Sequence, residues 1–121
     1  MTRVLVIDDE RAIVDVVRTI LEWNGYEVLA ADDGSRGFAA AQRQAPDAII
    51  LDLMMPIMDG FAVLEALRGH ERTAGVPVLV LTAVQNEDVE DRCSELGAKS
   101  YLRKPFEPDQ LLSALHAITA A

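Results

Sequence analysis

The sequence predicts an α/β protein in which helices cover both faces of one five-stranded parallel sheet. Short runs rich in Val, Ile and Leu alternate with segments of helical periodicity about ten residues long or more. This alternation is typical of right-handed βαβ units, which build a doubly wound sheet. The chain has 121 residues, the size of one compact domain, so we expect a single domain over residues 1–121.

The first strand and helix are the clearest elements. Arg3 to Ile7 is a β-branched apolar run that ends at three consecutive acids, and the helix after it is closed by Asn24 and Gly25. We expect the apolar residues of this helix to form one buried stripe: Ala12, Ile13, Val16, Val17, Ile20 and Leu21.

The middle of the chain repeats the pattern. Glu27 to Ala31 predicts a weaker second strand, and Asp33 can cap a second helix that ends before Pro46. Ala48 to Leu51 is an almost unbroken apolar run, typical of a strand buried on both faces, and it ends in Asp52.

The remaining elements follow in the same order. Helical spacing runs from Asp59 to about Arg68, and Val78 to Leu81 predicts the fourth strand. Asn86 can cap a fourth helix, Ser100 to Leu102 gives a short fifth strand, and Pro108 opens the last helix.

Composition narrows the class of protein. Twenty acidic and eleven basic residues give a formal net charge of −9, which disfavours direct binding to nucleic acid or to anionic membranes. No apolar run approaches the roughly 20 residues that span a bilayer, and we expect a cytoplasmic protein. Cys93 is the one cysteine, so it cannot form an internal disulfide, and we expect it to pack in the core.

Polar side chains stand at the carboxyl ends of four predicted strands, where ligands bind in sheets of this kind. They are Asp8, Asp9 and Glu10 after the first strand, Asp52 after the third, Thr82 after the fourth, and Lys104 with Pro105 after the fifth. Crowded carboxylates repel one another unless a cation lies among them. A cluster of oxygen ligands without histidine or cysteine suits Mg²⁺.

These motifs together resemble the receiver domain of bacterial two-component response regulators, and the resemblance covers essentially the whole chain. The motifs are Asp8-Asp9, Asp52 with the following Leu53-Met54-Met55-Pro56-Ile57-Met58-Asp59-Gly60, Thr82-Ala83, and Lys104-Pro105-Phe106. The resemblance implies a flavodoxin-like fold with strand order 2-1-3-4-5. It also implies a signalling module that controls a partner rather than an enzyme.

The resemblance assigns roles to three of these acids. Asp52 would accept a phosphoryl group from a sensor histidine kinase or a phosphotransfer protein. Asp9 and Asp52 would bind Mg²⁺ together with the backbone carbonyl of Met54, and Asp8 would hold the ion through water. Acceptance of the phosphoryl group and its slow loss would be self-catalysed.

The resemblance also implies a switch. Thr82 and Lys104 would contact the phosphoryl oxygens, and Tyr101 would turn inward when Thr82 moves. Pro105 would follow a cis peptide bond. The surface of the fourth helix, fifth strand and fifth helix would then change and control an effector protein or an attached output domain. From the residues alone, Tyr101 could equally be a half-buried strand aromatic with its hydroxyl in water.

Three other functions share parts of this pattern. A flavin-binding module would have the fold, but three acids in the first loop would repel a phosphate. A phosphatase of the haloacid dehalogenase type would need a second acid two residues after the nucleophile, where this chain has Met54. A partner-binding module that is not phosphorylated would lack part of the phosphorylation set, and no member is missing.

Other properties stay open in the sequence. The chain stops after the last helix, so it is either a stand-alone regulator or a piece of a longer protein. Lys99 and Ser100 stand where regulators that dimerise through the switch surface carry acids, so we expect a monomer or a phosphorylation-dependent dimer. Met54 and Val84 are apolar at positions that flank the phosphoryl group, which predicts a long-lived acyl phosphate.

Overall fold

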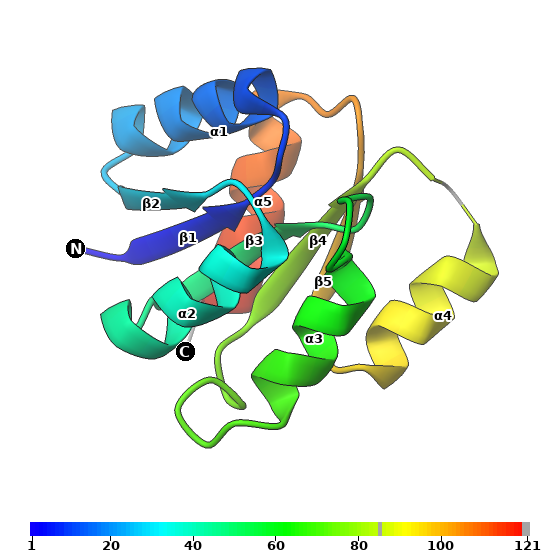
Figure 1. Ribbon diagram of the computed structural model, residues 1–121. Coiled ribbons are helices and arrows are strands. Elements are labelled where there is room, and N and C mark those ends of the chain that lie inside the picture. Colours follow the sequence, from blue (N-terminus) through cyan, green and yellow to red (C-terminus); the bar gives the residue numbers. More distant parts are fainter. Residues whose placement is uncertain (85, 120–121) are drawn as a thin grey trace.

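A five-stranded parallel sheet with strand order β2-β1-β3-β4-β5 forms the centre of the molecule (Figure 1). The computed structural model describes residues 1–84 and 86–119. The strands are β1 (Arg3–Ile7), β2 (Glu27–Ala31), β3 (Ala48–Asp52), β4 (Val78–Thr82) and β5 (Ser100–Arg103). The predicted fold class and strand order are confirmed.

Five helices connect and cover the strands. They are α1 (Arg11–Trp23), α2 (Gly34–Gln44), α3 (Gly60–Arg68), α4 (Glu87–Glu95) and α5 (Pro108–Thr119). Asp33, Asp59 and Asn86 cap α2, α3 and α4 by accepting backbone N–H bonds in the first turn, which satisfies donors that a helix leaves unpaired.

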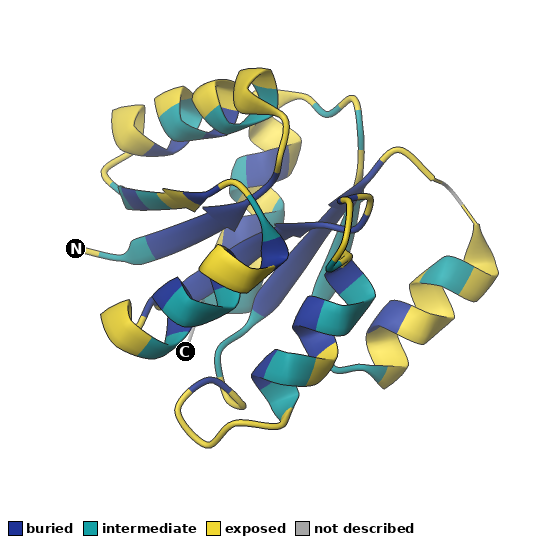
Figure 2. Ribbon diagram, in the orientation of Figure 1, coloured by how far each residue is buried: buried dark blue, intermediate teal, exposed yellow. Residues whose placement is uncertain are grey.

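Two hydrophobic cores lie on opposite faces of the sheet. One joins α1 and α5 to residues such as Val4 and Leu79, and the other joins α2, α3 and α4 to residues such as Leu5 and Val80. The central strands β1, β3 and β4 are almost wholly buried, as Figure 2 shows in dark blue. Cys93 is buried against the second core, as expected.

One core prediction was wrong. Val16 leaves 49% of its surface exposed, and Ala12 is also exposed. Because α1 lies over the edge of the sheet, only a narrow stripe of it is covered, and the buried positions are Val17 and Leu21. Val14 packs against this core instead of Val16.

The layered arrangement brings the carboxyl ends of β1, β3, β4 and β5 to one edge of the sheet, because parallel strands all point the same way. None of the helices in the described ranges is long and apolar enough to cross a membrane.

Candidate functional site

Asp52 lies at the centre of the predicted site. It is the last residue of β3 and only 2% exposed. Its Oδ1 accepts hydrogen bonds from the backbone N–H of Met54 at 3.4 Å and from Lys104 Nζ at 3.3 Å. Its Oδ2 is buried and has no hydrogen-bond partner among the described residues. A buried carboxylate oxygen without a partner is costly, which marks it as an atom that a ligand can satisfy.

The turn after β3 depends on a close approach of the backbone at Gly60. The Gly60 N–H donates to the carbonyl of Leu53 at 3.0 Å. A Cβ at this position would lie 2.6 Å from the carbonyl oxygen of Asp52, a distance that side chains do not adopt. Asp59 then caps α3, so the Asp59-Gly60 pair fixes the loop that carries Met54 past the site.

Lys104 joins three acids from two strand ends. Its Nζ lies 3.1 Å from Asp8 Oδ2, 3.4 Å from Glu10 Oε1 and 3.3 Å from Asp52 Oδ1. The predicted cis bond between Lys104 and Pro105 is confirmed, and the Lys104 N–H donates to the carbonyl of Thr82 at 2.8 Å.

The charges shift the acidity of these groups. Burial, and then the negative charge of Asp8, raise the pKa of Asp52 to about 6, although Lys104 and the Met54 N–H act in the opposite direction. Burial by itself lowers the pKa of Lys104, but the charges of Asp8 and Asp52 outweigh it and the net pKa is raised. Lys104 is therefore cationic at neutral pH.

The acids are arranged to hold a hard cation. Asp8, Glu10 and Asp52 each offer an oxygen, and these oxygens lie within 4.8 Å of one another. Oxygen ligands alone, with one buried oxygen unpartnered, fit Mg²⁺ in chemistry and in charge. Asp9 is exposed beside this group and is not one of its members.

Glu10 is the residue that the sequence prediction did not assign to the site. It was noted among the acids after the first strand but was given no role. Its contact with Lys104 depends on how the loop after β1 meets the loop after β5, 94 residues away, and sequence spacing carries no such information.

The predicted switch residues lie next to each other. Thr82 ends β4, is fully buried, and its Oγ1 accepts from the Val84 N–H at 3.1 Å. The hydroxyl of Tyr101 donates to the carbonyl of Val84. Tyr101 is half-buried on β5, as the simpler interpretation expects, and its exposed hydroxyl contacts the same residue that Thr82 holds.

Comparison with known proteins defines the class. A family model described as "Response regulator receiver domain" matches residues 4–116. The chain belongs to this family, and it is a receiver domain of two-component signal transduction.

Curated relatives match nearly the whole length of this chain. It is 46% identical over 118 residues to the DNA-binding dual master transcriptional regulator RpaA of Synechocystis, covering 98% of this chain and 49% of the relative. It is 39% identical over 116 residues to the alkaline phosphatase synthesis transcriptional regulatory protein PhoP of Bacillus subtilis, covering 96% and 48%. The chain thus spans about half the length of the curated relatives it matches.

Solved structures agree with the fold. The chemotaxis protein CheY4 of Vibrio cholerae is 36% identical and superimposes with a TM-score of 0.94, covering 98% of both chains. The receiver domain of a sensor histidine kinase from Pseudomonas aeruginosa, solved with a magnesium ion coordinated in its active-site cleft, is 29% identical with a TM-score of 0.91, covering 99% of this chain and 98% of that one.

Proposed function

We propose that Asp52 accepts a phosphoryl group from a phosphohistidine of a sensor histidine kinase or a phosphotransfer protein. The observation that carries this proposal is the Asp52 carboxylate itself. Lys104 holds one of its oxygens, and the other is buried with no partner among the residues that the structure describes. In the reaction an Asp52 oxygen bonds to phosphorus while the bond from phosphorus to the histidine nitrogen breaks. The imidazole leaves with the electron pair and takes up a proton.

Each side chain has a defined part in this proposal. Lys104 holds the attacking carboxylate in place and offers positive charge to the phosphoryl oxygens. The Met54 N–H fixes the carboxylate rotamer from the other side. Thr82 is buried one strand away and can turn its hydroxyl to a phosphoryl oxygen by giving up the Val84 N–H.

A magnesium ion belongs to the proposal. Asp52 and Asp9 would hold it with the Met54 carbonyl, and Asp8 through water, as predicted from the resemblance; the clustering of Asp8, Glu10 and Asp52 adds Glu10 as a candidate. When bound, the ion neutralises charge on the carboxylates and the phosphoryl oxygens. Acceptance and slow loss of the phosphoryl group are self-catalysed, with no separate substrate turned over.

The proposed output is the surface formed by α4, β5 and α5. Movement of Thr82 changes the backbone of Val84, and Val84 also holds the Tyr101 hydroxyl, so the two side chains move together. Cys93 is the one fully buried residue within α4, so this helix is held by few contacts and can shift at low cost. An effector protein, or an output domain in a longer chain, would read the change.

The test is phosphorylation with the small donor phosphoramidate and MgCl₂, followed by intact-mass measurement. We expect one acid-stable, base-labile phosphoryl group on the wild type and none on Asp52→Asn. Asp109→Asn is the matched control, because it makes the same chemical change at an exposed position in the first turn of α5. Unchanged labelling of Asp52→Asn would exclude Asp52 as the acceptor.

A further inference from the structure

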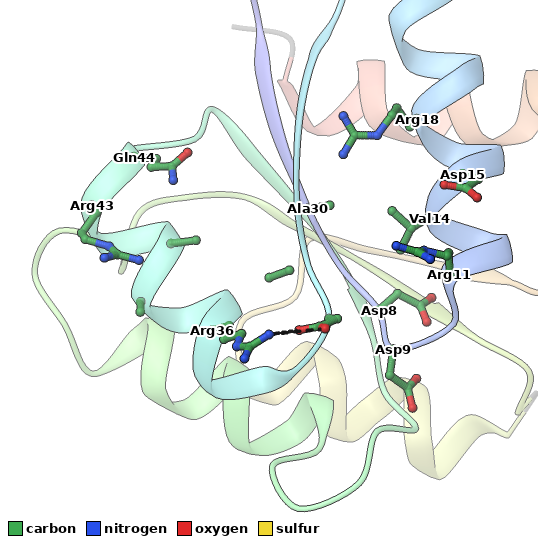
Figure 3. Close-up of a pocket in the computed structure, with 14 residues that line it drawn as sticks. Asp8, Asp9, Arg11, Val14, Asp15, Arg18, Ala30, Arg36, Arg43 and Gln44 are labelled. Atoms are coloured by element: carbon green, nitrogen blue, oxygen red, sulfur yellow. Dashed lines mark hydrogen bonds and ion pairs between the residues drawn. The ribbon is translucent and has the colours of Figure 1, made fainter.

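A groove follows the free edge of the sheet between α1 and α2, and one end of it reaches Asp8 and Asp9 of the candidate phosphorylation site. Its volume is about 770 Å³. Ala30 of β2 lies between its two walls, and Figure 3 shows arginine side chains on both sides of it. The four arginines of the lining are Arg11 and Arg18 from α1 and Arg36 and Arg43 from α2. Four of the eleven basic residues of the chain gather here, and the four aspartates of the lining balance them in formal charge.

Two of these cations lack a partner. Arg11 and Arg43, one on each wall, make no ion pair or hydrogen bond with any residue in the described ranges. Arg36 pairs with Asp32 at 3.1 Å and with Asp33 at 3.6 Å. Arg18 pairs with Glu22 at 3.9 Å and donates to the carbonyl of Val28 at 3.4 Å.

The acids of the lining are unevenly placed and leave part of the α2 wall with unpaired positive charge. Three of the four carboxylates in the lining, Asp8, Asp9 and Asp15, belong to the segment from the end of β1 into α1. Asp8 is already bound by Lys104, and the fourth, Asp32, is paired with Arg36. The wall formed by α2 therefore presents uncompensated positive charge at Arg43.

The groove also exposes backbone hydrogen-bonding groups. β2 is the edge strand, and its outer side has no neighbouring strand. The Glu27 N–H donates to Thr2 and the Ala31 carbonyl accepts from Asp8, so the odd-numbered residues of β2 face β1. Because successive residues of a strand alternate, the N–H and C=O of Ala30 point to the open edge, and Ala30 is exposed.

We propose that this groove binds an acidic peptide segment of a partner protein, added in extended conformation to the free edge of β2. The backbone of Ala30 supplies the strand pairing, and the arginines supply the preference for acids. Successive side chains of an added strand point to opposite faces of the sheet, and α1 and α2 cover opposite faces. Consecutive acidic residues would thus meet Arg11 and Arg18 on one side and Arg36 and Arg43 on the other.

The backbone edge is the reason to choose a peptide over another anion. A nucleotide or a polyphosphate could contact the guanidinium groups, but it offers no alternating donors and acceptors for Ala30. Asp52 does not line the groove, and the proposal does not require that Asp52 is phosphorylated.

The test uses the blocked, fluorescently labelled peptide Val-Glu-Glu-Val-Glu-Glu-Val, which places carboxylates on both faces of a strand. Binding is measured by fluorescence anisotropy, and hydrogen exchange of the Ala30 amide is followed by NMR. We expect saturable binding, slower exchange at Ala30, and no binding of the same peptide with Lys in place of Glu. Failure of the acidic peptide to bind more tightly than the basic one would overturn the proposal.

Two further arms separate strand pairing from simple charge attraction. The double variant Arg11→Glu, Arg43→Glu should weaken binding at least about tenfold. The control Arg72→Glu, Lys99→Glu makes the same charge change at exposed positions outside the groove and should bind within about twofold of the wild type. Equal weakening in both variants would contradict the proposal.

The last arm leaves the protein unchanged. One acidic peptide carries N-methyl groups on its odd-numbered backbone nitrogens, and a second carries them on its even-numbered ones. Each peptide keeps its charge but loses half of its backbone donors. We expect one of the two not to bind, because its methyl groups replace the N–H donors that face β2. If both methylated peptides, or inorganic tripolyphosphate, bind as well as the parent peptide, the groove is a general anion site and the proposal is wrong.

Discussion

At the scale of single residues, the environment of Asp52 sets its protonation. The pKa of Asp52 is raised from 3.8 to about 6, first by burial and then by Asp8. The folded protein therefore holds this proton more tightly than the unfolded chain does. Stability is greatest when Asp52 is protonated, and it falls as the pH rises from about 4 through 6.

Asp52→Asn removes the ionisation, so we expect it to stabilise the metal-free protein at pH 7.5. The gain should be about 2 kcal/mol, less than the full pKa shift implies because Lys104 loses a charged partner. It should shrink towards zero below about pH 3, where the wild-type carboxyl is protonated in both states. Urea unfolding in EDTA at several pH values measures this, and a difference independent of pH would contradict it.

The lifetime of the acyl phosphate is a second property of single residues. Met54 and Val84 are 65% and 37% exposed, so neither is packed away in the core, and both are free to lie beside the phosphoryl group. Neither side chain can hydrogen-bond an attacking water. We expect the double variant Met54→Asn, Val84→Glu to lose its phosphoryl group about tenfold faster than the wild type, since its polar groups can position that water.

The measurement is decay of the phosphorylated protein at saturating MgCl₂ after removal of the donor. A double variant that decays no faster than the wild type would show that these side chains do not set the lifetime. Because decay is followed only on protein that has been labelled, this result stays distinct from a failure to phosphorylate Asp52.

At the scale of elements, Arg68 connects three segments. Its guanidinium donates to the carbonyls of Ala74 at 2.6 Å and Val76 at 3.1 Å, before β4, and to that of Gly97 at 2.8 Å, between α4 and β5. Gly97 has a φ of +95°, and a Cβ there would lie 2.4 Å from Arg68 Nε. Arg68 thus ties the end of α4 to α3.

We expect Arg68→Met to cost about 2–4 kcal/mol of stability, because the half-buried carbonyls of Val76 and Gly97 and the exposed carbonyl of Ala74 lose a charged donor. Arg72→Met, four residues later and exposed, is the control and should change stability by less than about 0.5 kcal/mol. Urea unfolding gives both values. Equal effects of the two substitutions would mean that Arg68 does not act through these bonds.

At the scale of the whole molecule, the charge of −9 and the acids at one edge of the sheet make the folded state sensitive to cations. Carboxylates brought together by folding repel one another, and the unfolded chain largely escapes this repulsion. An ion that binds only the folded state raises stability by mass action.

We expect MgCl₂ at ten times its Kd to add about 1.4 kcal/mol of stability and to raise Tm by about 5 °C. NaCl at matched ionic strength should raise it less, since it only screens the repulsion. Thermal melting followed by circular dichroism measures the shift. If Mg²⁺ and Na⁺ act alike at matched ionic strength, the proposed ion site is wrong even if Asp52 is phosphorylated.

The sequence by itself determined the order and nature of the elements. Local signals were strong: β-branched runs predicted β1, β3 and β4, and the predicted caps Asp33 and Asn86 stand at the starts of α2 and α4. The topology followed because parallel strands with helical crossovers have few allowed arrangements. That same topology predicts that Asp8, Asp52, Thr82 and Lys104 lie at the edge of the sheet where its strands end.

Only the tertiary structure decided which of these groups touch. Helical periodicity could not show that Val16 lies beyond the edge of the sheet, because periodicity gives a face and not how much of it is covered. Nor could it show that Glu10 reaches Lys104 or that Tyr101 and Thr82 share Val84, since such contacts depend on how separate loops pack. The groove between α1 and α2 is a further example. Its two walls belong to separate helices, and their placement depends on the packing of the whole chain and not on any local segment.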